Sequence, residues 1–228
     1  MLRRHEVRAR PQPSRGPSTW RWVGMELESA GHDVVIQDLV GAAKTGDPAV
    51  FVRAAVEAID DSSEPAVLVG HSGAGAMLPL VAASVTAEPR AVVFVDAGIP
   101  PCDEAFSAGG PFLEVLRNLA TDGLLPKWST WWGDGVLDAM VPDNRRRREF
   151  EGELPIVPLR FYDAMIEVPA GWCTRPCSYL LLSEIYRSDL ERVTSLGWLV
   201  AEHPGNHLDI MNHEAAISDL LLDLSNHP

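Results

Sequence analysis

Residues 67–75 read Val-Leu-Val-Gly-His-Ser-Gly-Ala-Gly, and this run indicates the fold more strongly than any other part of the chain. An apolar strand stops at small residues, Ser72 stands among them, and a second apolar stretch begins at Met77. The pattern is typical of a nucleophile elbow, whose sharp turn strains the serine backbone and requires small neighbours, here Gly70 and Ala74. The alternative is a glycine-rich turn that packs closely against another backbone. A phosphate-binding loop is excluded because no lysine follows the glycines.

Strands and helices are predicted to alternate on both sides of this turn. Apolar spacing predicts helices over 20–30, 49–59 and 214–224, a helix after the elbow to about residue 85, and strands over 34–36, 66–69, 91–95, 179–182 and 198–201. Continuous apolar strands separated by helices indicate an α/β fold with a mostly parallel, doubly wound sheet that is buried on both faces. Ligands of such sheets bind at the carboxyl ends of the strands, where Ser72 and Asp96 are located.

The strand pattern lapses between about residues 101 and 169. Helical pieces, prolines and three tryptophans, Trp128, Trp131 and Trp132, replace it. We predict a helical lid inserted into a single domain that spans residues 1–228, with the tryptophans lining a substrate pocket. The alternative is a set of surface helices in which the tryptophans form a small core of their own.

Length, composition and charge restrict the classes of function. With 228 residues and 46% hydrophobic residues, the chain suits one soluble α/β domain. The formal charge of −13 repels phosphate backbones and anionic lipid headgroups, so we expect no nucleic-acid or membrane partner. No apolar stretch is long enough to span a membrane.

The three cysteines, Cys102, Cys173 and Cys177, are an odd number and too sparse for a disulfide framework. They therefore favour a reducing compartment, and we predict a cytoplasmic protein. Cys173 and Cys177 lack the spacing and the neighbouring ligands of a zinc site, so we interpret them as packing residues.

A serine hydroxyl needs a base and a group that orients the base before it reacts as a nucleophile. His207 follows the last predicted strand after a short Pro-Gly turn, which places it on a loop that can reach Ser72. His203 and His213 are close in sequence and are weaker candidates. We interpret His71, beside the serine, as a packing residue that points across the elbow.

The orienting acid is less clearly indicated. Asp96 directly follows the strand over 91–95, and Glu184 follows the strand over 179–182 equally directly, with Asp189 as a third candidate. We favour Asp96 narrowly because it lies at the same sheet edge as Ser72. Glu184 stays open as the alternative, and the other interpretation of each acid is a turn cap or a solvated loop charge.

These features resemble the α/β-hydrolase superfamily, in particular its small single-lid esterase and hydroxynitrile-lyase members. The matching residues are Gly70–Ala74, the strand end at 93–96, and Gly205-Asn206-His207. The order serine, acid, histidine also agrees with the family. Most members place the acid after the strand that corresponds to 179–182, and some place it one strand earlier.

The resemblance implies an oxyanion hole made by the backbone N–H of Gly73 and by a second N–H from a loop near the N-terminus. Family members carry an apolar strand before that loop, whereas this chain has Arg-Ala-Arg-Pro-Gln-Pro at 8–13. The two prolines cannot donate, which leaves Gln12, with Ser14 and Arg15, as candidates. Loss of one donor costs about 2.7–4 kcal/mol of transition-state stabilisation.

We therefore predict a serine hydrolase that cleaves an ester, lactone or related acyl bond of a small molecule through an acyl-enzyme on Ser72. His207 is the predicted base and Asp96 or Glu184 the predicted orienting acid. We expect no metal and no organic cofactor. Two alternatives remain: a non-hydrolytic, lyase-type enzyme on the same fold, and a ligand-binding protein that has lost turnover.

Overall fold

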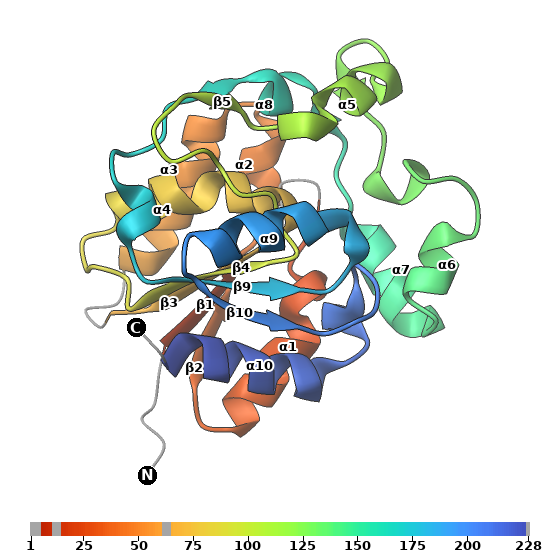
Figure 1. The fold of residues 1–228 in the computed structure, drawn as a ribbon. Helices are drawn as coiled ribbons and strands as arrows, with labels where there is room; N and C mark the ends of the chain where they lie inside the picture. Colours follow the sequence, from red (N-terminus) through yellow and green to blue (C-terminus); the bar gives the residue numbers. More distant parts are fainter. Residues whose placement is uncertain (1–5, 11–14, 61–64, 227–228) are drawn as a thin grey trace.

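A parallel sheet forms the centre of the molecule (Figure 1). The computed structural model describes residues 6–10, 15–60 and 65–226. Within these residues the sheet has six strands, in the order β10-β9-β4-β3-β1-β2, and every neighbouring pair is parallel. The strands are β1 (Glu6–Arg10), β2 (Asp33–Ile36), β3 (Val67–His71), β4 (Ala91–Val95), β9 (Cys177–Leu181) and β10 (Leu199–Glu202). The predicted doubly wound α/β fold is thereby confirmed.

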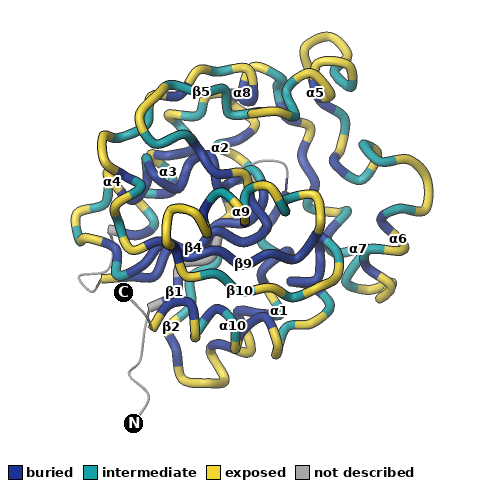
Figure 2. The backbone as a smooth tube through the Cα atoms, viewed as in Figure 1, coloured by how far each residue is buried: buried dark blue, intermediate teal, exposed yellow. Residues whose placement is uncertain are grey.

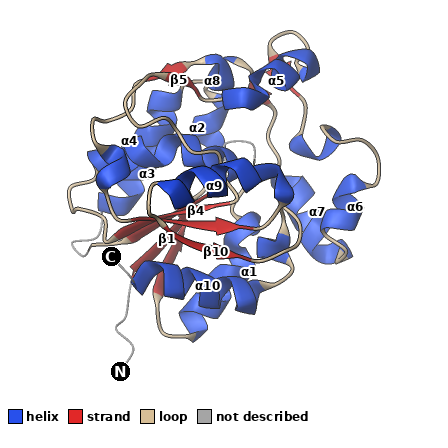
Figure 3. Ribbon diagram, viewed as in Figure 1, coloured by secondary structure: helices blue, strands red, loops and turns tan. Residues whose placement is uncertain are grey.

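Helices cover both faces of the sheet (Figure 3). Successive side chains of a strand point to opposite faces, so Val67 and Val69 of β3 pack in one core while Leu68 packs in the other. Helices α1 (Ser18–Ser29) and α10 (Glu214–Asn226) close the first core, and α3 (Pro48–Asp60), α4 (Leu78–Ser84) and α9 (Arg187–Ser195) close the second. The central strands are accordingly buried along their length (Figure 2).

Most predicted elements agree with the observed ones to within about two residues, but the sequence analysis did not identify β1. This strand lies inside the sheet, where it pairs with both β2 and β3. Its sequence alternates the charged residues Glu6, Arg8 and Arg10 with Val7 and Ala9, and Val7 is buried. A run with a charge at every second position does not give the continuous apolar signal that identified the other central strands.

The predicted elbow is a tight turn from β3 into a short 3₁₀ helix, η1 (Ser72–Met77), which leads directly into α4. Ser72 has φ of 56°, a conformation that costs energy in any residue with a side chain. A Cβ atom on Gly70 would lie 2.6 Å from Leu78 Cδ1, and one on Gly75 would lie 2.7 Å from the carbonyl oxygen of Gly98. The small residues therefore allow the close approach that the turn requires.

The segment between β4 and β9 contains no strand of the central sheet. Its elements are β5 (Phe106–Ser107), η2 (Gly110–Phe112), α5 (Leu113–Leu119), β6 (Leu124–Leu125), η3 (Trp128–Thr130), α6 (Val136–Met140), α7 (Asn144–Glu153), β7 (Val157–Pro158), α8 (Arg160–Asp163) and β8 (Met165–Ile166). Two short antiparallel pairs, β5 with β8 and β6 with β7, tie it together. Figure 1 shows this inserted segment, residues 101–169, beside and above the sheet.

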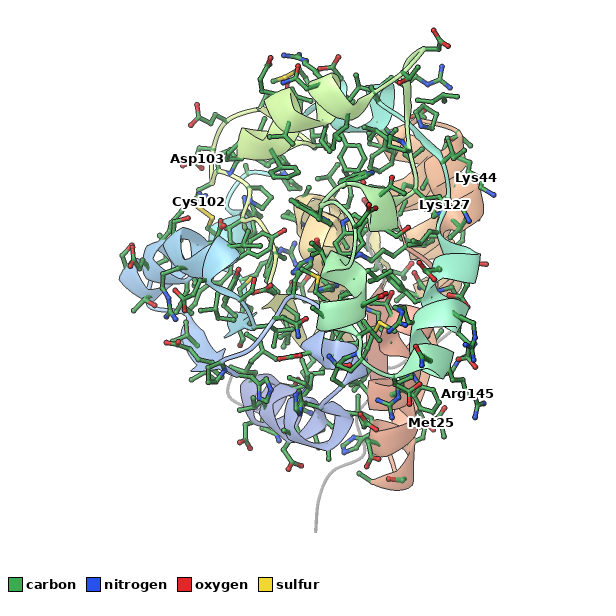
Figure 4. All side chains as sticks on the ribbon, turned by 90° about the vertical axis from the view of Figure 1, so that its right-hand side faces the viewer. Met25, Lys44, Cys102, Asp103, Lys127 and Arg145 are labelled. Carbon is green, nitrogen blue, oxygen red and sulfur yellow. A yellow bond between two sulfur atoms is a disulfide. The ribbon has the colours of Figure 1, made fainter. Side chains whose placement is uncertain are left out.

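The interpretation of Cys173 as a packing residue is wrong, because Cys102 and Cys173 form a disulfide. They are 71 residues apart in sequence, and they meet because the chain after β4 packs against the turn η4 (Trp172–Thr174) before β9, where Trp172 Nε1 donates to the carbonyl oxygen of Pro101 at 2.8 Å. The Cα atoms of the two cysteines lie 5.7 Å apart, within the range that a disulfide bridges. Figure 4 labels Cys102 at the start of the inserted segment, and the bond links it to the turn η4 that follows the segment.

Cys177 remains a free, buried thiol, as expected for a packing residue. We expected a reducing compartment because the cysteines are sparse and odd in number. The disulfide contradicts that reasoning, since such bonds persist in oxidising environments. Among the described residues, no helix is both long and apolar enough to cross a membrane.

Candidate active site

Three side chains meet at the carboxyl edge of the sheet. Ser72 begins the turn after β3, Asp96 follows β4, and His207 lies on the loop between β10 and α10. Ser72 Oγ lies 2.9 Å from His207 Nε2, and His207 Nδ1 lies 2.6 Å from Asp96 Oδ2. The carboxylate can only accept, so Nδ1 carries the imidazole proton and Nε2 accepts from the serine hydroxyl. The structure thus joins a hydroxyl, an imidazole and a carboxylate in one hydrogen-bonded line.

Asp96 is fully buried and rigidly held. Its Oδ1 accepts the backbone N–H groups of Leu182 and Ser183, both at 2.9 Å, and its Oδ2 accepts the Ser183 hydroxyl at 2.6 Å. These donors lie just beyond β9, the strand beside β4, so the sheet itself places them against the carboxylate. Asp96 also has φ of 42°, which turns its side chain toward His207 at the end of the strand.

Glu184, the alternative acid, lies elsewhere. It belongs to η5 (Glu184–Tyr186), its side chain is 80% exposed, and its carboxylate pairs with Arg187 at 2.7 Å. Asp189 accepts the backbone N–H of Ile99 at 3.0 Å and borders the neighbouring cavity. Of the three acids that the sequence left open, only Asp96 contacts the imidazole of His207.

Burial sets the electrostatics of this site. It lowers the pKa of His207 well below its usual value, and the positive charge of Arg15 adds to the effect. Burial raises the pKa of Asp96, while the hydrogen bonds from Ser183 and from the Leu182 N–H act in the opposite direction. A neutral imidazole beside a serine hydroxyl is the protonation state that general-base catalysis requires.

His71 packs against the His207 imidazole, and Arg15 contacts His71. His71 is buried, its Nε2–H donates to the carbonyl oxygen of His207 at 2.9 Å, and its ring lies 4.4 Å from the His207 ring. Arg15 Nη1 lies 3.5 Å from His71 Nδ1, and the guanidinium covers the Trp128 ring at 3.8 Å. Burial lowers the pKa of Arg15 to about 9. The prediction that His71 is a packing residue holds, with the addition that it fixes the backbone of His207.

Tyr186 contacts both His207 and Ser72. Its ring stacks on that of His207 with centroids 5.4 Å apart, and its hydroxyl lies 3.4 Å from Ser72 Oγ. Burial raises the pKa of Tyr186 to about 12, so the phenol keeps its proton at neutral pH. The side chain therefore limits the rotation of the imidazole and presents a neutral hydroxyl to the serine.

A cavity of about 410 Å³ opens beside Ser72, Gly73 and His207. The inserted segment supplies half of the residues that line it, among them the aromatic residues Phe106, Phe112, Trp128, Trp131, Trp132 and Tyr162, and Tyr186 lines it from outside that segment. Trp132 contacts both Trp128 and Trp131, and Trp128 also packs against Phe150 of α7. Trp128 is buried, Trp131 and Trp132 are partly buried, and all three border the cavity. Their role in binding a substrate stays a prediction.

The structure describes only some of the predicted oxyanion donors. Gly73 directly follows Ser72 and borders the cavity. Gln12 and Ser14 lie outside the described residues, and Arg15 enters the site through its side chain. The oxyanion role of Gly73 and of Gln12 stays a prediction.

Sequence reasoning missed Ser183, Tyr186 and the role of the Arg15 side chain. A signal for Ser183 was available, since it follows the strand next to Asp96 at the same sheet edge. Arg15 and Tyr186 carried no such signal. Their contacts depend on how segments before α1 and after β9 fold toward the same histidine.

Comparisons with known proteins agree with this architecture. A family model described as "Alpha/beta hydrolase family" matches residues 13–218. A search of curated proteins returned no match. Among solved structures, polyneuridine aldehyde esterase aligns with a TM-score of 0.80 at 17% identity, covering 98% of this chain and 100% of that one.

Two further solved structures show the same likeness. An extracellular alpha/beta-hydrolase from a Paenibacillus species aligns with a TM-score of 0.77 at 18% identity, over 97% of this chain and 99% of that one. Tomato Methylketone Synthase I, solved with 2-tridecanone, aligns with a TM-score of 0.75 at 14% identity, over 99% of both chains. At these identities the likeness establishes a common fold, on which different chemistries occur.

Proposed function

This chain belongs to the alpha/beta hydrolase family, and from that premise we propose that it hydrolyses an ester, lactone or related acyl bond of a small, largely apolar molecule. The observation that carries the proposal is the line of contacts from Ser72 Oγ to His207 Nε2 at 2.9 Å and from His207 Nδ1 to Asp96 Oδ2 at 2.6 Å. Such a line makes a serine hydroxyl nucleophilic on many unrelated folds.

In the acylation step, Ser72 Oγ attacks the carbonyl carbon of the substrate while its proton passes to His207 Nε2. The Asp96 carboxylate stabilises the imidazolium, and the Gly73 N–H donates to the developing oxyanion. When the tetrahedral intermediate collapses, the carbon–oxygen bond to the leaving group breaks. The leaving alcohol takes the proton from Nε2, and the acyl group stays on Ser72.

In the deacylation step, a water molecule attacks the acyl carbon and gives its proton to the same Nε2 atom. Collapse of the second intermediate breaks the bond to Ser72 Oγ, the serine regains its proton, and the carboxylic acid leaves. Every proton transfer uses one imidazole atom, which is why the support of His207 by Asp96, His71 and Tyr186 matters for the rate.

The cavity favours neutral, partly aromatic substrates of modest size. Its walls are mainly aromatic and aliphatic side chains, and its volume of about 410 Å³ is in the range of small-molecule sites. Asp189 and Arg192 also border it, yet Arg192 donates to the carbonyl oxygens of Ile99 and Pro100 and is thereby engaged in the wall. We therefore expect charged substrates to bind more weakly than neutral ones.

A fluorophosphonate probe tests the proposal. We expect it to add one mass equivalent to the wild-type chain and none to Ser72→Ala, and we expect hydrolysis of p-nitrophenyl esters to disappear in the same variant. Labelling of Ser72 without turnover of any ester would favour a non-hydrolytic reaction. Absence of both labelling and turnover would favour a ligand-binding protein, and either result rejects the hydrolase.

A further inference from the structure

A second group of side chains, two histidines and an aspartate that could each offer a ligand atom to a metal ion, lies on the loop that carries His207. His203 follows β10, Asp209 begins the short helix η6 (Asp209–Met211), and His213 directly precedes α10. One potential ligand atom from each residue lies within 4.8 Å of the other two. Asp209 is buried, whereas His213 is 54% exposed, so the group opens to solvent.

The distances within this group are too long for hydrogen bonds. His203 Nε2 lies 3.8 Å from Asp209 Oδ2, and His213 Nε2 lies 4.0 Å from Asp209 Oδ1. Ligand atoms around a tetrahedral zinc ion with bonds of 2.0–2.1 Å are about 3.4 Å apart. The ligand atoms, which lie within 4.8 Å of one another, are farther apart than in a bound site, and the exposed His213 side chain is the one that must move closer.

The carboxylate is held in place as a metal ligand commonly is. Asp209 Oδ1 accepts the side-chain amides of Asn206 at 2.6 Å and Asn212 at 3.1 Å, and Oδ2 accepts the backbone N–H of Asn206 at 2.9 Å. Oδ2 therefore keeps a lone pair on the side of His203. A Cβ atom on Gly205 would lie 1.7 Å from Oδ2, so only glycine at this position lets the carboxylate occupy its place. Partners of this kind orient the ligands of metal sites.

We propose that His203, Asp209 and His213 bind a divalent transition-metal ion of the Zn²⁺ class. Two imidazoles and one carboxylate suit such ions, whereas Mg²⁺ and Ca²⁺ prefer oxygen ligands alone. Three protein ligands leave one position open to solvent. The ion links His203, directly after β10, to His213, directly before α10. It thereby connects the two ends of the loop that contains His207.

This inference does not depend on the proposed hydrolase activity, and binding is its primary readout. Isothermal titration of Zn²⁺ into the full chain should give one site in the wild type. The His213→Ala and His203→Ala variants should each bind at least about tenfold more weakly, since even the loss of an outer partner of a ligand weakens metal affinity about 10- to 100-fold. Mg²⁺ should show no binding.

Two control variants separate this site from other histidines. His207→Ala should keep wild-type affinity for Zn²⁺, which distinguishes the proposed site from an ion bound between Ser72 and Asp96. A double His5→Ala/His227→Ala variant should also keep it. The wild type should unfold at a higher temperature with Zn²⁺ than without it, and His213→Ala, altered at a half-exposed position, should show a smaller increase at the same Zn²⁺ concentration.

Several results would overturn the proposal. They are the absence of Zn²⁺ binding to the wild type at millimolar concentration, unchanged affinity in both His203→Ala and His213→Ala, or equal affinity for Mg²⁺. Loss of the wild-type affinity in His207→Ala or in the His5/His227 variant would place the ion elsewhere and reject the site as well.

Discussion

Replacement of Asp96 by asparagine should abolish most of the activity while leaving the fold in place. Asp96 Oδ1 accepts two backbone N–H groups, and Oδ2 faces the Ser183 hydroxyl and His207 Nδ1. An asparagine has one oxygen and one NH₂ group for these two places. The NH₂ group in the Oδ1 place would confront two donors at 2.9 Å, at a cost of about 1–3 kcal/mol for each unpaired group.

The asparagine oxygen is therefore expected to take the Oδ1 place, with the NH₂ group toward His207. An NH₂ group there donates to Nδ1 and so moves the imidazole proton to Nε2, which can then no longer accept the serine proton. The equivalent change in serine proteases lowers kcat about 10⁴-fold. This factor corresponds to about 5.4 kcal/mol of activation free energy, at about 1.36 kcal/mol for each factor of ten.

The assay is kcat for p-nitrophenyl ester hydrolysis, with thermal unfolding of each variant as a check on the fold. Glu184→Gln is the matched control, because Glu184 is exposed and pairs with Arg187 on the surface, and its kcat should stay within about twofold of wild type. The reasoning is refuted if Asp96→Asn keeps kcat within tenfold of wild type while folded, or if Glu184→Gln loses as much activity as Asp96→Asn.

Three further changes test other features of the structure. The positive charge of Arg15 lowers the pKa of His207, so Arg15→Met should raise that pKa and move the acid limb of the kcat/KM profile to higher pH; an unmoved limb would contradict the effect. Cys102→Ser removes a bond that closes 71 residues and should lower the free energy of unfolding by about 2–4 kcal/mol in chemical denaturation, and a reductant should destabilise the wild type but not the variant. Gly75→Ala places a Cβ atom 2.7 Å from a backbone carbonyl oxygen and should cost about 1–3 kcal/mol of stability by the same measurement, whereas Gly41→Ala, with open space around it, should cost nothing.

The comparison of predicted and observed elements shows which signals are local. Helices α1, α3 and α10 and strands β3, β4 and β9 could be predicted because their apolar periodicity depends only on neighbours in sequence. Strand β1 could not, since its backbone becomes a strand by pairing with β2 on one side and β3 on the other. The disulfide was missed for the same kind of reason, because two cysteines 71 residues apart meet only when the chain after β4 packs against the turn before β9.

The amino-acid order alone determined that a serine stands on a strained turn after a buried strand, and that an acid and a histidine follow other strands at the same edge. These properties rest on residue size and on periods of two and 3.6, which act over a few residues. Only the tertiary structure shows which of Asp96 and Glu184 contacts the imidazole, because this depends on which carboxylate the neighbouring strand surrounds with donors and which one faces solvent. The same holds for Arg15 and for the group around Asp209, since their chemistry comes from contacts that form when distant segments pack together.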